Sequence, residues 1–322
     1  MTQAPAPVEA RGLVKRYGEI VAVDDVDLNV GAGDVYGYLG PNGAGKTTSL
    51  RMLLGLISPT AGSARLFGRD PMLEGARALD GVAGFVEEPR FYPYLSGRKN
   101  LEMCAAFDGG GAAKRIDGVL EIVDLSDRAR DRVGGYSHGM RQRLGIAGAL
   151  LRQPRLLLLD EPATGLDPAG MRDMRTLIRR LADGGMTVLL SSHLLAEVEE
   201  LCDRVAIIRR GRIVYEGALA ELTATTGAKG YRLRTTDYKH ALRVCGEQRN
   251  VDDARGDGDQ IRFSASEQVA AELSIALGKA GVGITALTPE VASLEELFFR
   301  LTEDGAEAAP PRSDPQPSLS AP

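Results

Sequence analysis

A glycine-rich loop holds the residues of this chain best suited to chemistry. Residues 40–47 read GPNGAGKT and fit the pattern G-x-x-x-x-G-K-[ST], between an apolar strand signal and a helical one. In such a loop, backbone N–H groups wrap a phosphate chain, the lysine contacts the terminal phosphates and the hydroxyl ligates Mg²⁺. The residues expected to hold the phosphate chain are Gly40, Pro41, Asn42, Gly43, Ala44, Gly45, Lys46, Thr47 and Thr48.

Two acids and a histidine follow other apolar runs. Asp160 and Glu161 come after four leucines, where a buried strand would deliver them to the edge at which α/β sheets place ligands. We expect Asp160 to hold Mg²⁺ and Glu161 to orient or deprotonate an attacking water. His193 ends another strand pattern and has two open roles, donor to a phosphate or structural residue.

A second anion-binding pattern occurs in YSHGMRQR, residues 136–143. A serine and a glycine precede an amphipathic helix, whose N-terminal N–H groups favour an anion. An ordinary N-capped helix would have the same pattern. The question is why one chain would carry two phosphate-binding elements.

The surrounding sequence predicts an α/β fold. Residues 8–30 alternate as antiparallel strands with a turn near Gly18, and a helix follows the glycine-rich loop until SPTAG. Helical patterns alone occupy about 89–151, which indicates an inserted helical subdomain. Apolar strand signals separated by helices indicate a parallel sheet covered on both faces.

Changes of composition suggest the domain limits. We expect a nucleotide-binding domain over 8–217 and a small α+β domain over 218–304, with disordered ends at 1–7 and 305–322. The second domain has the order strand, helix, two strands, helix, strand, helix, which is typical of a ferredoxin-like fold. The expected elements are 231–235, 237–245, 249–265, 267–280, 283–288 and 293–302.

Composition and charge exclude several classes of function. The 322 residues are 43% hydrophobic and 26% charged, with a net charge of −5, so no nucleic-acid partner is expected. The basic run RRGR at 209–212 is expected to border a turn. Three scattered cysteines form neither a disulfide framework nor a metal cluster, and no signal peptide or membrane span is apparent.

In this order, the motifs resemble those of the nucleotide-binding subunit of ATP-binding-cassette (ABC) transporters, over about 8–217. Tyr17 in VKRYG matches the family's adenine-stacking aromatic residue, and YSHGMRQR matches the signature sequence. Asp167 in TGLDP matches the loop that communicates between subunits, and His193 matches the switch histidine. The resemblance implies ATP and Mg²⁺ as ligands and ATP hydrolysis as the reaction.

The resemblance also explains the second phosphate element. In this family, two subunits pack head to tail, and each ATP lies between the glycine-rich loop of one and the signature of the other. Ser137, His138, Gly139 and Met140 would therefore contact the ATP held by a second copy of the chain. A helix N-terminus favours the extra negative charge of ATP over ADP, so ATP closes the dimer and hydrolysis reopens it.

The chain departs from the family pattern in two places. Glu87 stands where a glutamine normally contacts the metal, and it is expected to ligate Mg²⁺ as a carboxylate. The signature has Tyr136, His138 and Met140 where commoner versions have Leu, Gly and Gln. These residues and the C-terminal segment SLEELFFRLT resemble those of the subgroup of bacitracin- and daunorubicin-type exporter ATPases.

The subgroup implies a separately encoded membrane permease and attachment of this chain to the cytoplasmic face of the membrane. The aromatic residues Phe91, Tyr92 and Tyr94 are either a docking surface for the permease or packing inside the helical subdomain. Glu197, Glu199 and Glu200 are expected on a solvated helix face.

The expected function is an ATPase motor that drives an exporter, with antibiotic resistance as a speculative role. An ABC-type regulator of ribosomes or DNA is the alternative, disfavoured by the single cassette and negative charge. An inactive binding module is disfavoured by the joint presence of Lys46, Asp160, Glu161 and His193.

Overall fold

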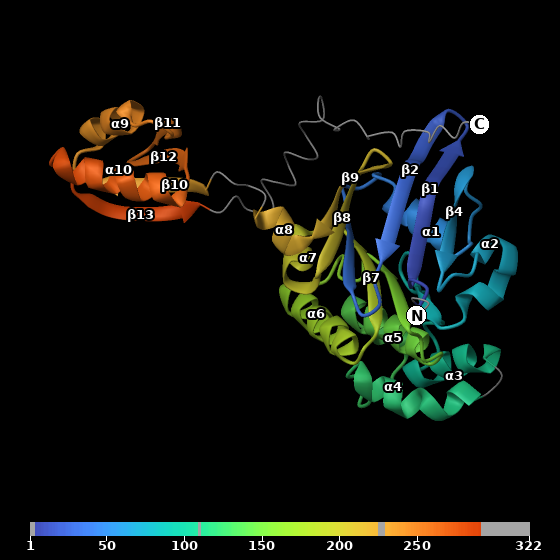
Figure 1. Cartoon of the computed structure of the whole chain (residues 1–322). Helices are drawn as coiled ribbons and strands as arrows, with labels where there is room; N and C mark the ends of the chain where they lie inside the picture. The colour runs from blue at the N-terminus through green and yellow to red at the C-terminus, as the bar shows by residue number, and fades with distance from the viewer. Residues whose placement is uncertain (1–3, 109–110, 225–228, 291–322) are drawn as a thin grey trace, which may run out of the picture.

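A six-stranded sheet forms the centre of the computed structural model, which describes residues 4–108, 111–224 and 229–290 (Figure 1). The strand order is β5-β6-β7-β3-β8-β9. The first five strands are parallel and β9 runs antiparallel to β8. Their bounds are β3 Val35–Leu39, β5 Val82–Phe85, β6 Leu156–Asp160, β7 Thr187–Ser192, β8 Arg204–Arg209 and β9 Arg212–Ala218.

Every residue of β3, β6 and β7 is buried, which explains why their sequences do not alternate. One hydrophobic cluster joins alternate residues of these strands to the helices, and a second joins the other residues to the antiparallel strands and α1. The predicted α/β sheet covered on both faces is confirmed.

A three-stranded antiparallel sheet of order β2-β1-β4 covers one of these faces (Figure 1). Strands β1 (Val8–Tyr17) and β2 (Ile20–Val30) form the expected hairpin around Gly18. Strand β4 (Ala61–Leu66) pairs with β1, and sequence reasoning missed it because AGSARL contains few strand-forming residues.

The helices between β5 and β6 form the expected helical region, at the lower right in Figure 1. Ser96, Ser137 and Asp167 cap the N-termini of α3, α5 and α6 with side-chain oxygens. The helices of residues 4–224 are α1 Lys46–Leu53, α2 Pro71–Glu74, α3 Gly97–Phe107, α4 Ile116–Ile122, α5 His138–Leu150, α6 Pro168–Asp183, α7 Leu195–Leu201 and α8 Leu219–Ala224, with 3-10 turns η1 Gly75–Leu79, η2 Gly111–Arg115 and η3 Val133–Gly135.

The run RRGR makes the turn between β8 and β9, as predicted. Arg210 and Gly211 both have positive φ, of 47° and 81°, which suits a two-residue hairpin turn. The carbonyl of Gly211 accepts a hydrogen bond from Asp24 N–H (2.8 Å), and Arg212 forms an ion pair with the Asp24 carboxylate. The turn therefore fastens the central sheet to β2.

Residues 229–290 form a separate four-stranded sheet of order β11-β12-β10-β13, with helices α9 and α10 and a hydrophobic core of their own. This order confirms the ferredoxin-like arrangement. The expected helix at 293–302 and the tail at 305–322 lie outside the described residues. The elements are β10 Lys229–Thr235, α9 Tyr238–Glu247, β11 Asp252–Asp257, β12 Gln260–Ala265, α10 Glu267–Lys279 and β13 Ile284–Glu290.

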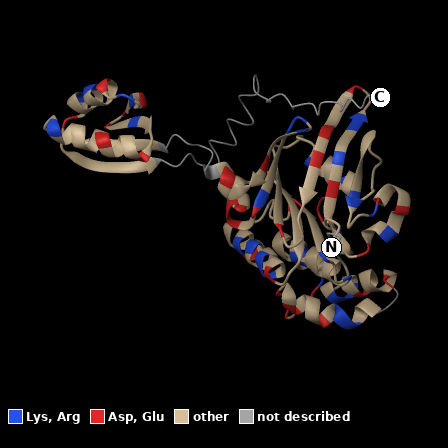
Figure 2. Cartoon of the chain, in the orientation of Figure 1, with Lys and Arg blue, Asp and Glu red and all other residues tan. Residues whose placement is uncertain are grey.

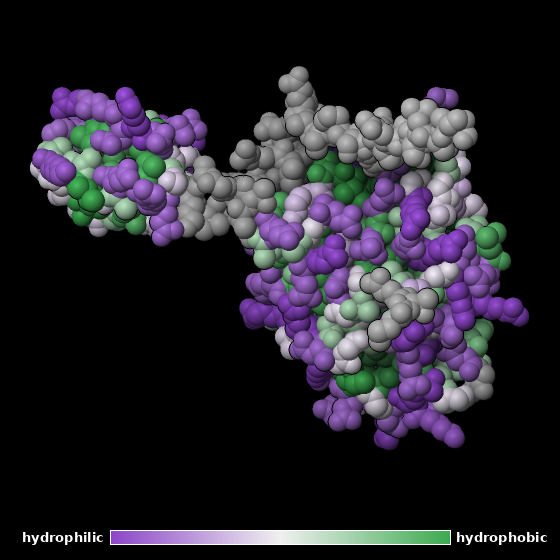
Figure 3. All heavy atoms as spheres, viewed as in Figure 1, coloured by the Kyte–Doolittle hydropathy of each residue, from purple (hydrophilic) through white to green (hydrophobic). Residues whose placement is uncertain are grey.

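The surface of the described residues mixes both charge signs, and Lys, Arg, Asp and Glu are interspersed in Figure 2. In Figure 3 the visible face is largely hydrophilic, with small apolar patches such as the one at α2, where Leu73 is 85% exposed. At the end of the segment 1–7, the Pro7 carbonyl accepts a hydrogen bond from Phe67 N–H (3.2 Å). Within the described residues, no helix is long and apolar enough to span a membrane.

We expect Leu158→Ala to lower the unfolding free energy of the cassette by about 2–5 kcal/mol, because it opens a cavity in the central sheet. Leu158 is fully buried in β6, two residues before Asp160. Urea denaturation followed by far-UV circular dichroism measures the change. The control Leu73→Ala on exposed α2 should stay within about 0.5 kcal/mol of wild type. Equal effects of the two variants would contradict the assigned core.

Candidate functional site

The glycine-rich loop connects β3 to α1 in a conformation that requires glycine. Gly43 and Gly45 have φ of 79° and 109°. A Cβ atom on Gly40 would lie 2.4 Å from the Ile208 carbonyl oxygen, and one on Gly45 would lie 2.5 Å from that of Ala22. The backbone N–H groups in the first turn of α1 have no side-chain cap and suit an anion.

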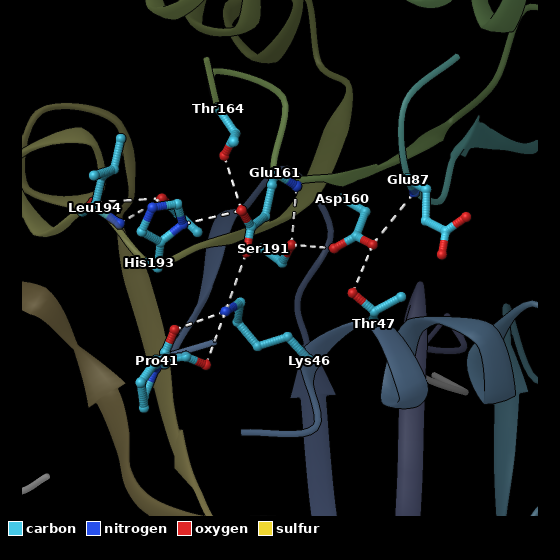
Figure 4. A network of polar contacts seen from close by, with 12 residues as sticks. Pro41, Lys46, Thr47, Glu87, Asp160, Glu161, Thr164, Ser191, His193 and Leu194 are labelled. Carbon is cyan, nitrogen blue, oxygen red and sulfur yellow. Dashed lines mark hydrogen bonds and ion pairs between the residues drawn. The ribbon is translucent and has the colours of Figure 1, made fainter. Parts of the chain in front are cut away.

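Lys46 is the cation of this loop and is only 4% exposed. Its Nζ donates hydrogen bonds to the carbonyl oxygens of Gly40 (2.7 Å) and Pro41 (3.2 Å). It also forms an ion pair with Glu161 Oε1 at 3.2 Å (Figure 4). The lysine thus joins the end of β3 to the acid that follows β6.

Thr47 and Asp160 bring together the oxygen ligands that a Mg²⁺ ion prefers. Thr47 Oγ1 donates a hydrogen bond to Asp160 Oδ2 at 2.9 Å, from α1 to the end of β6. Ser191 Oγ, at the end of β7, donates to Asp160 Oδ1 at 2.5 Å. Both carboxylate oxygens of Asp160 are therefore held in place (Figure 4). This donor set fits the ion.

Glu161 is held by three side chains. Its Oε2 accepts a hydrogen bond from Thr164 Oγ1 (2.8 Å) and contacts His193 Nδ1 at 2.9 Å, while Oε1 faces Lys46. Burial by itself raises the pKa of this carboxyl, but the Thr164 hydrogen bond and the charge of Lys46 outweigh it and lower the pKa below its ordinary value. Glu161 is therefore a carboxylate at neutral pH, with the protonation state of a base.

Glu87 enters the same network by its backbone and not by its side chain. Its N–H donates to Asp160 Oδ2 at 3.3 Å, whereas its carboxylate forms an ion pair with Arg51 and is 61% exposed. Figure 4 shows this carboxylate pointing away from Thr47 and Asp160. In this conformation the predicted ligand does not face the other two.

The signature residues lie at the N-terminus of α5, beside a cavity of about 390 Å³. Ser137 Oγ accepts a hydrogen bond from Met140 N–H (3.2 Å), so its oxygen caps its own helix. His138 contacts the Thr164 carbonyl oxygen through Nε2 (3.0 Å) and Glu88 through Nδ1 (3.3 Å). Ser137, His138 and Gly139 line this cavity, and Met140 is packed against the core.

A smaller hollow of about 180 Å³ lies at the glycine-rich loop, lined by Lys46, Thr47, Glu161 and neighbouring loop residues. Its lining shares no residue with that of the signature cavity. The structure therefore does not bring the signature residues of a chain onto its own Lys46. The two elements predicted to bind anions line separate hollows of one subunit.

The remaining predicted residues lie outside the central network. Asp167 lines the signature cavity and accepts a hydrogen bond from Gly170 N–H at 2.8 Å, which caps α6. Tyr17 ends β1, is 47% exposed, and has the Lys15 ammonium 5.1 Å from its ring centroid. Phe91 packs against the core, as the packing interpretation predicted, while Tyr92 and Tyr94 are exposed and their role as a docking surface stays a prediction.

Sequence reasoning missed Ser191 and Thr164, the hydroxyl donors to Asp160 and Glu161. Their signal was available, because each lies on a motif already identified: Ser191 precedes His193 by two residues, and Thr164 lies within the TGLDP stretch. The solvated face expected for Glu197, Glu199 and Glu200 is wrong for Glu197, which is 1% exposed. The helical period puts Glu197 on the inner side of α7, while the other two are exposed.

The fold and this network define a P-loop ATPase of the ABC class. Residues 23–164 match the family model described as ABC transporter. Over 92% of this chain and 98% of its relative, the sequence is 39% identical to the bacitracin transport ATP-binding protein BcrA of Bacillus licheniformis. It is 38% identical to the daunorubicin/doxorubicin resistance ATP-binding protein DrrA of Streptomyces peucetius, over 94% of each chain.

The chain thus belongs to the ATP-binding proteins of ABC transporters and is an ATPase subunit, as the sequence predicted. It also resembles the ATP-binding cassette MJ0796, solved as a dimer in a post-hydrolysis state bound to ADP and Pi. That likeness has a TM-score of 0.59 and 25% identity, and covers 66% of this chain and 98% of the cassette. None of these relatives supports the alternative of a ribosome- or DNA-acting regulator.

The lowered pKa of Glu161 predicts a pH effect on stability. A carboxyl whose folded-state pKa lies below the ordinary value contributes stability above that value and loses it as the pH falls through the folded-state pKa. Between about pH 5 and pH 3, the unfolding free energy of wild type should therefore fall more steeply than that of Glu161→Gln. Urea titrations at several pH values test this. The exposed control Glu199→Gln should follow wild type, and parallel curves for Glu161→Gln and wild type would refute the assignment.

Proposed function

We propose that this chain is the motor subunit of an ABC exporter, in which ATP binding closes a dimer and drives a separately encoded permease. The observation that carries the proposal is the meeting of Lys46, Thr47, Asp160, Glu161 and His193 at one edge of the sheet. ATP with Mg²⁺ is the ligand set that these groups fit.

ATP binding uses the loop and α1. The N–H groups of residues 43–48 wrap the phosphates, and Lys46 exchanges its contact with Glu161 for the β- and γ-phosphates. Tyr17, exposed at the end of β1, stacks on the adenine. Thr47 and Asp160 hold Mg²⁺, which when bound offsets phosphate charge. Glu87 joins them only if its carboxylate leaves Arg51.

Hydrolysis uses the groups around Glu161. Once Lys46 has turned to the phosphates, Glu161 keeps its contacts with Thr164 and His193 and accepts a proton from the attacking water. His193 donates a hydrogen bond to the γ-phosphate and stabilises the charge that develops there. A proton acceptor, Glu161, and a hydrogen-bond donor, His193, thus flank the reacting phosphate.

A complete site needs a second copy of the chain. The signature cavity and the phosphate hollow are separate surfaces of one subunit, which supports a head-to-tail dimer. In that dimer, Ser137, His138, Gly139 and Met140 contact the partner's ATP through the N-terminus of α5, and Asp167 carries the state of one site to the other. The MJ0796 cassette, solved as a dimer bound to ADP and Pi, supports a dimeric state.

Export of a drug-like or peptide compound is proposed from the names of the relatives, which act in bacitracin transport and in daunorubicin/doxorubicin resistance. The permease holds this chain at the cytoplasmic face of the membrane, and the exposed Tyr92 and Tyr94 are candidate contacts for it. A role in antibiotic resistance follows if the cargo is an antibiotic.

We expect Glu161→Gln to bind ATP but to hydrolyse it about 100-fold or more slowly, because the general base is lost. The variant should accumulate as a closed dimer in ATP and Mg²⁺, which size-exclusion chromatography measures.

Affinity-tagged and expressed in its native host, the Glu161→Gln variant should co-purify with a polytopic membrane protein after gentle detergent extraction. Normal hydrolysis would disprove the role of Glu161, and recovery with ribosomes would disprove the transporter role.

Mixing two inactive variants tests the composite site. Lys46→Ala removes the ammonium group that contacts the phosphates, and Ser137→Ala alters the signature. Each homodimer should therefore be inactive. A mixed dimer has one intact loop facing one intact signature, and half of the randomly formed dimers are mixed. We therefore expect about a quarter of wild-type ATPase activity after the variants are unfolded, mixed and refolded together. Activity no greater than that of either variant alone would contradict a site shared between chains.

A further inference from the structure

Glu197 is a buried carboxyl that has no part in the proposed binding and hydrolysis of ATP. It lies in the first turn of α7 with 1% of its surface exposed. Its Oε2 accepts a hydrogen bond from Ser192 Oγ at 2.6 Å, and its Oε1 has no hydrogen-bond partner within the described residues. Burial raises the pKa of this carboxyl. Burying a carboxyl group costs free energy, so the contacts that Glu197 makes have to compensate for that cost.

Ser192, the residue that Glu197 contacts, forms hydrogen bonds with two other parts of the site. The Ser192 carbonyl oxygen accepts a hydrogen bond from Gly40 N–H at 3.2 Å, at the start of the phosphate loop. Ser192 Oγ accepts a second one from Leu194 N–H at 3.0 Å. Ser192 therefore connects the phosphate loop to the two residues that follow it, His193 and Leu194.

The nearby charges do not replace this hydrogen bond. Arg175 on α6 lowers the pKa of Glu197 electrostatically, but its guanidinium forms an ion pair with Glu200 at 2.6 Å. His193 also acts on Glu197 through its charge, while its Nδ1 contacts Glu161. Ser192 is thus the close polar contact of Glu197 among the described residues.

We propose that Glu197 is a positioning residue for hydrolysis: through Ser192 it fixes the segment 192–194, so that His193 stays aligned with Glu161. The inference rests on the proposed role of His193. Glu197 itself does not contact the reacting phosphate. It acts on the rate because a displacement of about 1 Å at an aligned group can cost up to a hundredfold in rate.

The test compares the steady-state ATPase kinetics of the full-length chain and its variants. Glu197→Ala should lower kcat about tenfold or more and leave the KM for ATP within about twofold, because the phosphate loop is intact. Glu197→Gln should recover most of kcat, since an amide oxygen still accepts from Ser192. Glu199→Ala, on the exposed face of α7, is the matched control and should behave as wild type.

A double-mutant cycle identifies the contact. Both Ser192→Ala and Glu197→Ala remove the Ser192–Glu197 hydrogen bond, and Ser192→Ala also removes the contact with Leu194 N–H. The combined effect of the two changes on kcat should therefore be no larger than that of Ser192→Ala alone. Additive effects, or a Glu197→Ala enzyme with unchanged kcat, would overturn the inference. So would equal loss of kcat and ATP binding, which would indicate a general loss of structure.

His193→Ala, measured in parallel, separates this inference from the proposed function. Loss of kcat in His193→Ala with normal kcat in Glu197→Ala would reject only the positioning role. Normal kcat in His193→Ala would reject the role of His193 itself. Thermal melting of each variant, with at least about 90% of molecules folded at the assay temperature as the criterion, keeps every result interpretable.

Discussion

The site depends on one constraint, which is that buried parallel strands end at the same edge of a sheet. Strands β3, β6 and β7 are adjacent through parallel pairing and buried along their whole length. Their following residues are therefore forced together, although they come from positions near 40, 160 and 193. The apolar interior fixes the strands, and polar residues such as Asp160 and Ser191 stand at or just after the strand ends.

Electrostatics then determines which of these polar groups contact one another. Asp160 and Glu161 are adjacent acids, and each is stabilised by different partners. Hydroxyl groups surround Asp160, which suits the proposed sharing of a cation with Thr47. The Thr164 hydrogen bond and the charge of Lys46 outweigh burial and lower the pKa of Glu161, which keeps it ionised. Two neighbouring carboxyl groups thus acquire different chemistry from their surroundings.

Contacts also connect the two anion-binding surfaces within one chain. His138 of the signature contacts the carbonyl of Thr164, and the hydroxyl of the same Thr164 donates to Glu161. His138 meets Glu88 on its other side, next to the residue whose N–H contacts Asp160. A shift at the signature therefore has a short path of direct contacts to both acids. This gives a physical basis for communication between the two sites of the proposed dimer.

The sequence by itself determined the elements that have strong local signals. The loop GPNGAGKT, the four leucines before Asp160 and the apolar run before His193 each specify a strand and the turn after it, because their hydrophobic patterns and glycines permit little else. The family resemblance added the expected role of the signature and the second copy of the chain that it would contact. Only the tertiary structure decided the contacts made by single side chains. Glu197 is buried on Ser192, and the Glu87 carboxylate turns to Arg51, because helix packing and the neighbouring charges set these orientations, and neither appears in a local pattern.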